Sequence, residues 1–354
     1  MFLARKLPFG SGMNETNEFR VATASRPRGT EATHVLVIVN PKSRGGQSAL
    51  ASTLATLRES RLVPEVTETS APRHATQLVR EFVSASPGKY AAVFSLGGDG
   101  TAMEVASALA ELKDAPPLGI VAVGTANILA RSLGIPVNPA RAVAALLDAK
   151  AVRIDIGRIE GGPAFAIGLG VGLDATMISG TSSVLKRRIG YAAYALSALR
   201  AGLRLERFRA TITVDGVVHV VDASSVLVAN FGTVLGGLLC FGEEIGHCDG
   251  VLDVCVYSPG SYFEAMRIFW RMLRGGVSRD CRVRIIRGRH VRIETDPPRP
   301  MQADGELLGL TPVDIRVEPN AVRVLVPNAT PRRWRIPRLA ATRGHTEQLE
   351  SWTP

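Results

Sequence analysis

Residues 95–101, with the sequence SLGGDGT, have the composition of a phosphate-binding loop. Three glycines surround Asp99, and a glycine backbone can approach a ligand more closely than other residues allow. A helix that starts at such a loop offers free N–H groups and the positive end of its dipole to an anion. The carboxylate of Asp99 would repel a phosphate unless Mg²⁺ or a transferring proton lay between them. The loop therefore indicates a site for a nucleotide with its metal ion. The alternative is an ordinary strand-to-helix turn in which Asp99 caps the helix.

Two other short segments share this polar, glycine-bearing character. Residues 40–46 read NPKSRGG, and residues 124–127 read GTAN; each follows an apolar run. In an open parallel sheet, the loops beyond the carboxyl ends of the strands line one crevice. We therefore expect all three segments to face the same ligand.

The elements that must position these loops alternate between strand and helix through the first half of the chain. The β-branched, apolar runs at 34–39 and 90–96 indicate buried strands. The alternation predicts a parallel sheet with helices on both faces. The expected strands are 34–39, 65–69, 90–96 and 118–123, and the expected helices are 49–58, 74–84, 101–113, 125–133 and 140–149.

After about residue 154 the pattern changes to short strands separated by glycines, which favours a mostly antiparallel β-sandwich. The uncharged stretch 223–240 is interpreted as a buried strand and a glycine loop rather than a transmembrane helix, because polar residues and glycines interrupt it. The expected strands are 164–168, 210–214, 217–221, 225–230, 252–257, 283–287, 290–294 and 321–326.

The composition fits a folded protein of about two domains. Of the 354 residues, 46% are hydrophobic and 21% are charged, which excludes a largely disordered chain. The four cysteines form no CxxC pair and the N-terminal segment lacks a signal-peptide pattern, so we expect a reducing cytoplasm and no zinc site. Segments 1–32 and 327–354, rich in Arg, Pro, Ser and Thr, are expected to be disordered basic extensions.

The formal charge of +10 is concentrated in a few segments. Residues 186–209 carry a net charge of +6 and residues 262–292 one of +7, whereas the remainder between the two ends sums to −8. Segments 184–205 and 262–274 mix basic, aromatic and aliphatic residues at helical spacing. Such helices lie on anionic bilayers, and a helix packed on the sandwich with a solvated arginine face is an equal alternative.

Other nucleotide and hydrolase motifs are absent from the sequence. The chain has no GxxxxGK[ST] and no GxSxG, and the glycines at 168, 170 and 172 lack the spacing of a dinucleotide fingerprint. We interpret that glycine cluster as a strand leading into a turn.

Four motifs, in this order, resemble those of the bacterial diacylglycerol kinase family, whose catalytic domain is shared with sphingosine and ceramide kinases. They are NPKS at 40–43, GGDGT at 97–101 with Glu104, GTAN at 124–127 and DGE at 304–306. The resemblance implies an ATP-binding α/β domain at 33–154, with a Rossmann-like parallel sheet of the NAD kinase and phosphofructokinase kind. It also implies a β-sandwich lipid-acceptor domain at 155–326, whose last strand could return to the first domain, and a cleft where ATP·Mg²⁺ phosphorylates a lipid hydroxyl.

Carried over residue by residue, the resemblance implies a role for each matching position. Glu306 would be the base that takes the proton from the acceptor hydroxyl, and Asp99 would act at the phosphate–metal site. Asp249 would hold a structural Mg²⁺ with the backbone oxygens of Gly246 and Val251, although DGxLD is also an ordinary turn before a strand. The implied ATP-binding residues are Asn40, Pro41, Lys42, Ser43, Thr69, Gly97, Gly98, Asp99, Gly100, Thr101, Ala102, Met103, Glu104, Gly124, Thr125 and Asn127.

Two departures from the family pattern bear on the loops and the substrate. Ala122 stands where family members often have proline, and Ile128 stands where diacylglycerol kinases frequently have aspartate. Diacylglycerol is the first expectation for the acceptor, with a sphingoid base or ceramide as alternatives. A soluble NAD kinase-like enzyme is a further alternative, but no Asn-Glu pair follows Thr101. A nucleic-acid binder is not expected, because only 5% of the residues are aromatic.

The resulting prediction is a cytoplasmic lipid kinase of phospholipid metabolism that requires ATP and Mg²⁺. We expect it to associate peripherally with the inner face of the membrane through the basic helices at 184–205 and 262–274. No nucleic acid is expected as a partner, and a homodimer is left open.

Overall fold

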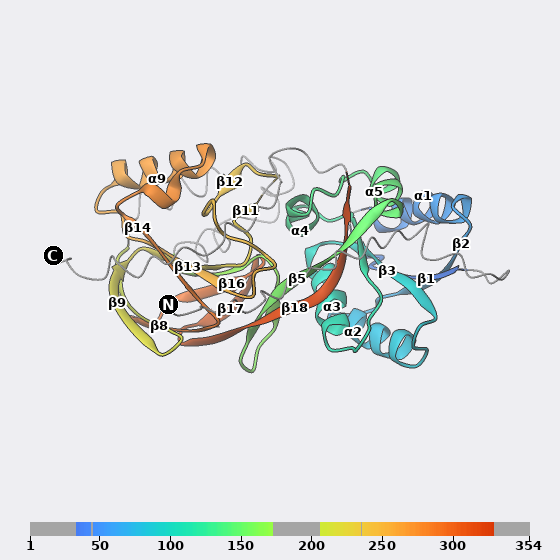
Figure 1. The fold of residues 1–354 in the computed structure, drawn as a ribbon, viewed down its shortest axis with the longest axis horizontal. Helices are drawn as coiled ribbons and strands as arrows, with labels where there is room; N and C mark the ends of the chain where they lie inside the picture. The colour runs from blue at the N-terminus through green and yellow to red at the C-terminus, as the bar shows by residue number, and fades with distance from the viewer. Residues whose placement is uncertain (1–32, 44, 173–205, 235, 329–354) are drawn as a thin grey trace, which may run out of the picture.

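The computed structural model describes residues 33–43, 45–172, 206–234 and 236–328. An α/β half and a β-sandwich half lie side by side, with helix α9 on the outer end of the sandwich (Figure 1). The elements of the first half are β1 (Thr33–Val39), α1 (Gly46–Glu59), β2 (Leu62–Glu68), α2 (His74–Val79) with a π-helical turn η1 (Arg80–Ser84), β3 (Tyr90–Gly97), α3 (Asp99–Ala110), β4 (Leu118–Ala122), α4 (Ile128–Ser132) and α5 (Pro139–Leu147).

The first half is built on four parallel strands in the order β2-β1-β3-β4. Strands β1, β3 and β4 are almost continuously buried because helices cover both faces of the sheet, which explains their uninterrupted apolar sequences. The loops that follow these three strands leave the sheet at the same edge. They are the three polar, glycine-bearing segments of the sequence.

The second half packs two mostly antiparallel sheets face to face around a shared core. One sheet has the order β14-β13-β10-β7-β16-β17, and the other contains β18, β15, β8 and β9. The elements are β5 (Ala149–Ile159), β6 (Ala164–Phe165), β7 (Gly168–Gly172), β8 (Phe208–Val214), β9 (Val217–Ala223), β10 (Ser225–Ala229), β11 (Thr233–Val234), β12 (Leu239–Cys240), β13 (Leu252–Tyr257), α9 (Tyr262–Arg274), η2 (Val277–Arg279), β14 (Val283–Gly288), β15 (His290–Asp296), β16 (Pro300–Ala303), β17 (Glu306–Leu310) and β18 (Val313–Pro327).

Strand β18 joins the two halves. Its first part pairs with β15 in the sandwich, and its last part returns to the parallel sheet, where Val324 pairs with Leu118 of β4. Strand β5 runs antiparallel to β18 along most of its length, with a register shift between Glu318 and Val322. One continuous sheet therefore passes through both halves and sets their relative position.

The expected fold class is confirmed: a parallel α/β unit is followed by a β-sandwich. The sequence analysis missed β5, the two-stranded β11–β12 unit and the β16–β17 hairpin. The stretch 223–240 contains β10 and the short strands β11 and β12, and the described residues include no helix long and apolar enough to span a bilayer. The expected basic helix at 184–205, the extension at 1–32 and all but the first two residues of the extension expected at 327–354 lie outside the described residues. Of those two, Pro327 is the last residue of β18.

Candidate functional site

The loops after β1 and β3 are joined by direct hydrogen bonds. The side-chain amide of Asn40 donates to Thr101 Oγ1 at 3.2 Å, and the backbone N–H of Asn40 donates to the Leu96 carbonyl at 2.9 Å. Thr69, after β2, donates its N–H to the carbonyl of Val39 at 2.8 Å. The segments predicted to share one ligand thus meet at the carboxyl edge of the parallel sheet.

Within the loop after β1, the side chain of Asn40 also organises its neighbours. Its Oδ1 accepts the N–H of Lys42 at 3.0 Å. The backbone carbonyl of Asn40 accepts the hydroxyl of Ser43 at 2.7 Å. Pro41 lies between them in the turn. Lys42 is exposed, and its Nζ lies 3.4 Å from the carbonyl of Ser70. This ammonium group therefore stands at the rim of the edge where the loops meet.

The loop after β4 reaches the glycine loop through two glycines. A β-carbon on Gly124 would lie 2.7 Å from the Cα of Gly98 and 2.9 Å from Asn127 Oδ1, which is closer than side chains normally approach. The N–H of Val123 donates to the carbonyl of Gly97 at 2.8 Å. The two loops form one surface because neither carries a side chain at their contact.

Asp99, the first residue of α3, faces the start of α4. Its Oδ1 accepts the N–H of Leu129 at 3.0 Å in the first turn of α4. Burial raises the pKa of Asp99, while the backbone N–H groups of Ile128, Leu129 and Asn127 oppose that rise. The capping alternative considered from the sequence is therefore wrong, because Gly98 occupies the N-cap of α3 and Asp99 holds the start of α4 instead.

Glu306, which belongs to the sandwich half, lies near the glycine loop of the α/β half. It is the first residue of β17, and its side chain is exposed. Its Oε1 lies only 3.2 Å from the position that a β-carbon on Gly100 would occupy. A carboxylate of the sandwich thus lies beside the N-terminal end of α3, at the loop predicted to hold phosphates.

Asp304 fixes the turn that carries Glu306. Its carboxylate accepts the backbone N–H groups of Ala166, Ile167 and Gly168 at 2.8, 2.9 and 3.1 Å. Burial raises the pKa of Asp304 to about 6, and the negative charge of Asp99 contributes to the rise. The sequence analysis quoted Asp304 as part of a motif but assigned it no role, because its partners lie more than 130 residues away.

Three of the predicted ATP-binding residues point elsewhere. Ala102 and Met103 are 2% and 8% exposed and pack in the core of the α/β half. The carboxylate of Glu104 accepts the N–H of Arg73 at 2.9 Å and that of Ala75 at 3.1 Å, at the start of α2. Their side chains hold helices in place, and a role toward ATP stays a prediction for these positions.

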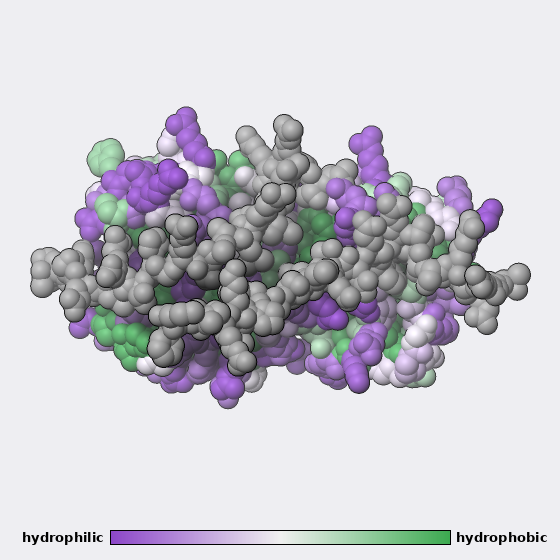
Figure 2. All heavy atoms as spheres, in the orientation of Figure 1, coloured by the Kyte–Doolittle hydropathy of each residue, from purple (hydrophilic) through white to green (hydrophobic). Residues whose placement is uncertain are grey.

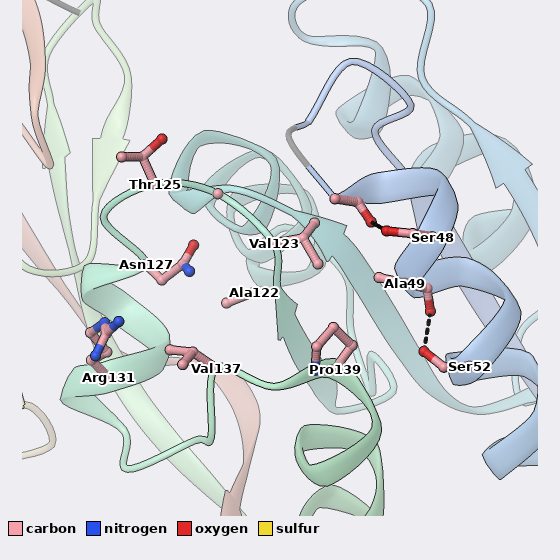
Figure 3. A pocket seen from close by; sticks show the side chains of 12 residues that line it. Ser48, Ala49, Ser52, Ala122, Val123, Thr125, Asn127, Arg131, Val137 and Pro139 are labelled. Carbon is pink, nitrogen blue, oxygen red and sulfur yellow. Dashed lines mark hydrogen bonds between the residues drawn. The ribbon is translucent and has the colours of Figure 1, made fainter. Parts of the chain in front are cut away.

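A cavity of about 510 Å³ opens beside the glycine contact. Figure 3 shows Ser48 and Ser52 of α1 on one side of it, Thr125 and Asn127 on the other, and Val123 between them. Asn127 is 5% exposed, and its Oδ1 lacks a hydrogen-bond partner among the described residues. The sequence analysis missed Ser48, Ser52, Val137 and Pro139, although the spacing of the two serines places both on one face of α1.

The second predicted metal site has a different electrostatic arrangement. Gly246, Asp249 and Val251 do lie together, since Asp249 Oδ1 accepts the N–H of Val251 at 3.3 Å and Gly246 adjoins Asp249 Oδ2. Arg287 Nη2 lies 2.8 Å from that Oδ2, so a guanidinium supplies the positive charge that we had assigned to Mg²⁺. A metal ion here stays a prediction, and the described residues contain no group of three or more His, Cys, Asp or Glu side chains suited to a metal.

The glycine loop fits a metal ion that arrives bound to a nucleotide. Mg²⁺ in phosphate-transfer sites uses one or two carboxylates and takes its other ligands from phosphates and water. Asp99, within the loop, is a carboxylate of this kind. A closed cluster of protein ligands is not required for such an ion.

Comparisons with known proteins agree with this architecture. Residues 34–159 match the family model of the diacylglycerol kinase catalytic domain, and residues 168–326 match the YegS C-terminal NAD kinase beta sandwich-like domain. A "Probable lipid kinase YegS-like" of Pseudomonas aeruginosa is 30% identical over 298 residues, which are 84% of this chain and 95% of that protein. A "Diacylglycerol kinase" of Bacillus subtilis is 29% identical over 222 residues, which are 62% of this chain and 72% of that protein.

A solved structure shows the same fold over both halves. The crystal structure of a "putative diacylglycerol kinase" from Bacillus anthracis superposes with a TM-score of 0.71 at 26% sequence identity, covering 86% of this chain and all of the other. The two family models follow each other along the chain as the two halves of the structure do. The chain therefore belongs to the lipid kinase family that is built on the diacylglycerol kinase catalytic domain.

Proposed function

We propose that the protein transfers the γ-phosphate of ATP to the hydroxyl group of a membrane lipid, with diacylglycerol as the acceptor. The observation that carries this proposal is the apposition of Glu306 and Gly100 across the two halves. Phosphoryl transfer requires positioned phosphates and a carboxylate within reach of the attacking hydroxyl, and little other covalent chemistry. The glycine loop and Glu306 supply these two requirements at one place.

The roles of the residues follow from their positions. The N–H groups at the start of α3 would hold the phosphates beside Gly98 and Gly100, and exposed Lys42 would approach them from the rim. Glu306 would accept the proton of the lipid hydroxyl while the hydroxyl oxygen bonds to the γ-phosphorus. The bond between the γ-phosphorus and the ADP oxygen breaks, and ADP leaves. Because Glu306 is exposed, it could return that proton to water.

Mg²⁺ bound to the ATP would offset negative charge on the phosphates. Asp99 is the residue of this chain that would hold it there, and its bond to Leu129 keeps the carboxylate in a fixed orientation. The same bond ties α4 to the phosphate loop.

The cavity beside Gly124 suits the nucleoside part of ATP. Its volume of about 510 Å³ falls within the range of small-molecule sites. Asn127 lines this cavity, and its buried, unpartnered Oδ1 could receive a hydrogen bond from an amino group of the base if the side chain turned toward the cavity. Thr125, which is exposed, also lines this cavity.

The choice of diacylglycerol is supported by the matched catalytic-domain family and by the Bacillus subtilis relative. Ile128, at the start of α4, is the position that departs from the pattern of diacylglycerol kinases. A sphingoid base or ceramide would contain the same kind of acceptor hydroxyl. An assay of labelled ATP with vesicles containing each lipid in turn, followed by identification of the product, separates these alternatives from a soluble acceptor such as NAD.

The role of Glu306 can be tested in the same assay. Glu306→Gln should lower kcat by roughly 100-fold or more, because the amide cannot accept the proton. Its unfolding midpoint should stay unchanged, because the side chain is exposed. Glu81→Gln, a change at an exposed glutamate remote from the loops, is the matched control. Full lipid phosphorylation by Glu306→Gln would remove the base assignment.

A further inference from the structure

The exposed positions of α9 form a single stripe with an unusual composition. They are Phe263, Arg267, Trp270 and Arg274, and their spacing of four, three and four residues places them on one face of the helix. Phe263 is 83% exposed and Trp270 is 52% exposed. A surface helix normally shows small polar and charged residues to water. The solvent face of α9 instead alternates large aromatic rings with arginines.

The rest of the helix is held firmly, so the stripe is not a result of poor packing. Ile268 is buried and Met272 packs beside it against the sandwich. Asp280, whose side chain is fully buried, accepts Arg267 Nε at 2.9 Å and pairs with Arg271 Nη1 at 3.3 Å. Ser261 Oγ caps the N-terminus by accepting the N–H of Glu264 at 3.3 Å.

These contacts distinguish the arginines that hold α9 in place from the arginine that is available to a partner. Arg267 and Arg271 are engaged by Asp280, so they fix α9 to the protein as much as they face solvent. Arg274 is exposed, and its guanidinium stacks over the ring of Trp270 at 4.3 Å from the centroid. The aromatic rings, with Arg274, are therefore the groups that are available to a partner.

Aromatic side chains beside arginines suit the boundary between lipid headgroups and acyl chains. There the rings and the arginine stems reach apolar material while the guanidinium groups stay near phosphates. The charge selects the lipid, because residues 262–292 carry nine arginines and only two acidic residues, Glu264 and Asp280. These two acidic residues are paired with arginines. Arg287 and Arg292 pair with carboxylates outside the segment, which reduces the positive excess without removing it. We propose that the α9 stripe docks the protein on an anionic lipid bilayer through Phe263, Trp270 and Arg274.

The stripe is linked to the candidate active site through a short series of contacts. Helix α9 packs beside β12, and exposed Leu238 immediately precedes that strand. Strand β12 pairs with β11, where the carbonyl of Thr233 accepts the hydroxyl of Ser132 in α4 at 3.4 Å. Asp99 holds the start of α4.

The figures place these elements on one side of the molecule. Figure 1 shows α9, β12, β11 and α4 along the upper edge, and Figure 2 shows hydrophobic and strongly hydrophilic residues side by side where α9 lies. Docking along this edge would bring the bilayer to the side of the molecule that carries α4. The proposal rests on the proposed function in this respect, since it assigns the membrane as the source of the lipid acceptor.

The test measures co-sedimentation of the full chain with vesicles of equal parts phosphatidylglycerol and phosphatidylcholine. Removal of both rings in Phe263→Ser/Trp270→Ser should weaken partitioning about tenfold or more. Arg274→Gln should reduce binding to these vesicles and leave the weak binding to pure phosphatidylcholine unchanged. The matched control Val218→Ser/Val220→Ser removes two side chains that are 58% and 60% exposed on β9, and it should bind like the unmodified chain.

Two outcomes would overturn the docking surface. One is unchanged partitioning of the double aromatic variant. The other is a lipid-free dimer of the unmodified chain that the same substitutions dissociate, which would assign the stripe to a second copy. Activity toward a dispersed short-chain diacylglycerol separates this proposal from the proposed function. The double variant should retain that activity, whereas an unmodified chain that binds vesicles but phosphorylates no lipid would support the surface and contradict the kinase.

Discussion

Gly98 and Gly124 meet asymmetrically at the centre of the candidate site. A β-carbon on Gly124 would lie 2.7 Å from the Cα of Gly98, whereas one on Gly98 would lie 3.6 Å from the Cα of Gly124. The first distance requires the backbone to move, and the second is an ordinary van der Waals contact. The two loops therefore tolerate a methyl group on one side of their contact only.

We expect Gly124→Ala to lower the free energy of unfolding by roughly 1–3 kcal/mol, as overpacking does, and to raise KM for ATP. Gly98→Ala should leave the free energy of unfolding nearly unchanged, even if its methyl group hinders the phosphates. Urea unfolding of both variants, with ATP titrations, measures the difference. Equal losses of stability would contradict the asymmetry.

The pH dependence of stability should report on Asp304. Burial raises its folded-state pKa to about 6, above its ordinary value near 4. At pH values between about 4 and about 6, the folded protein therefore holds a proton on Asp304 that the unfolded chain has released. The stability of the unmodified chain relative to Asp304→Asn should therefore rise as the pH falls through this window, by up to on the order of 3 kcal/mol. Urea unfolding of both proteins at pH values near 7 and near 4 checks this. A constant difference would contradict the raised pKa.

Glu104→Ala should separate a structural role from a nucleotide-binding role. The substitution removes the acceptor of the Arg73 and Ala75 N–H groups at the start of α2, which should cost about 1–2 kcal/mol of stability. KM for ATP should change little, because the carboxylate is directed at α2. Glu111→Ala, at the C-terminal end of α3, breaks the exposed ion pair with Arg80 and should lower the free energy of unfolding by under about 1 kcal/mol. A large rise in KM with unchanged stability would restore the ATP-binding assignment of Glu104.

Asp280→Asn should loosen α9. Hydrogen bonding to Arg267 is the main cause that lowers the pKa of Asp280. The ionised carboxylate therefore contributes to the free energy of unfolding at neutral pH, and this contribution is lost in acid, as the pH falls below about 4. Loss of the charge should cost roughly 1–2 kcal/mol, a value reduced because both arginines are partly solvated. Faster amide hydrogen exchange in 262–274, with unchanged exchange in α3, is the expected signature. Unchanged exchange in α9 would show that Ile268 and Met272 are sufficient to hold the helix.

The parallel sheet, the sandwich and the three loops that meet at one sheet edge could be predicted from the sequence alone. These features depend on local patterns: buried strands read as apolar runs, and glycine-rich turns mark where strands end. The two serines on α1 had a usable signal in their helical spacing. The long strand β5 also had a usable signal, because its charged residues alternate with apolar ones, but the sequence analysis did not assign it.

Which side chains face the site and which hold the fold depends on contacts that are visible only in the folded protein. The contact between Glu306 and Gly100, the bonds from Asp304 to residues 166–168 and the pairing of Asp249 with Arg287 all join segments far apart in the chain. Such contacts depend on how β18 returns to the parallel sheet and places the sandwich against it. A carboxylate in a turn, in a helix cap or at a catalytic loop has the same sequence signature, and its neighbours in space distinguish these roles.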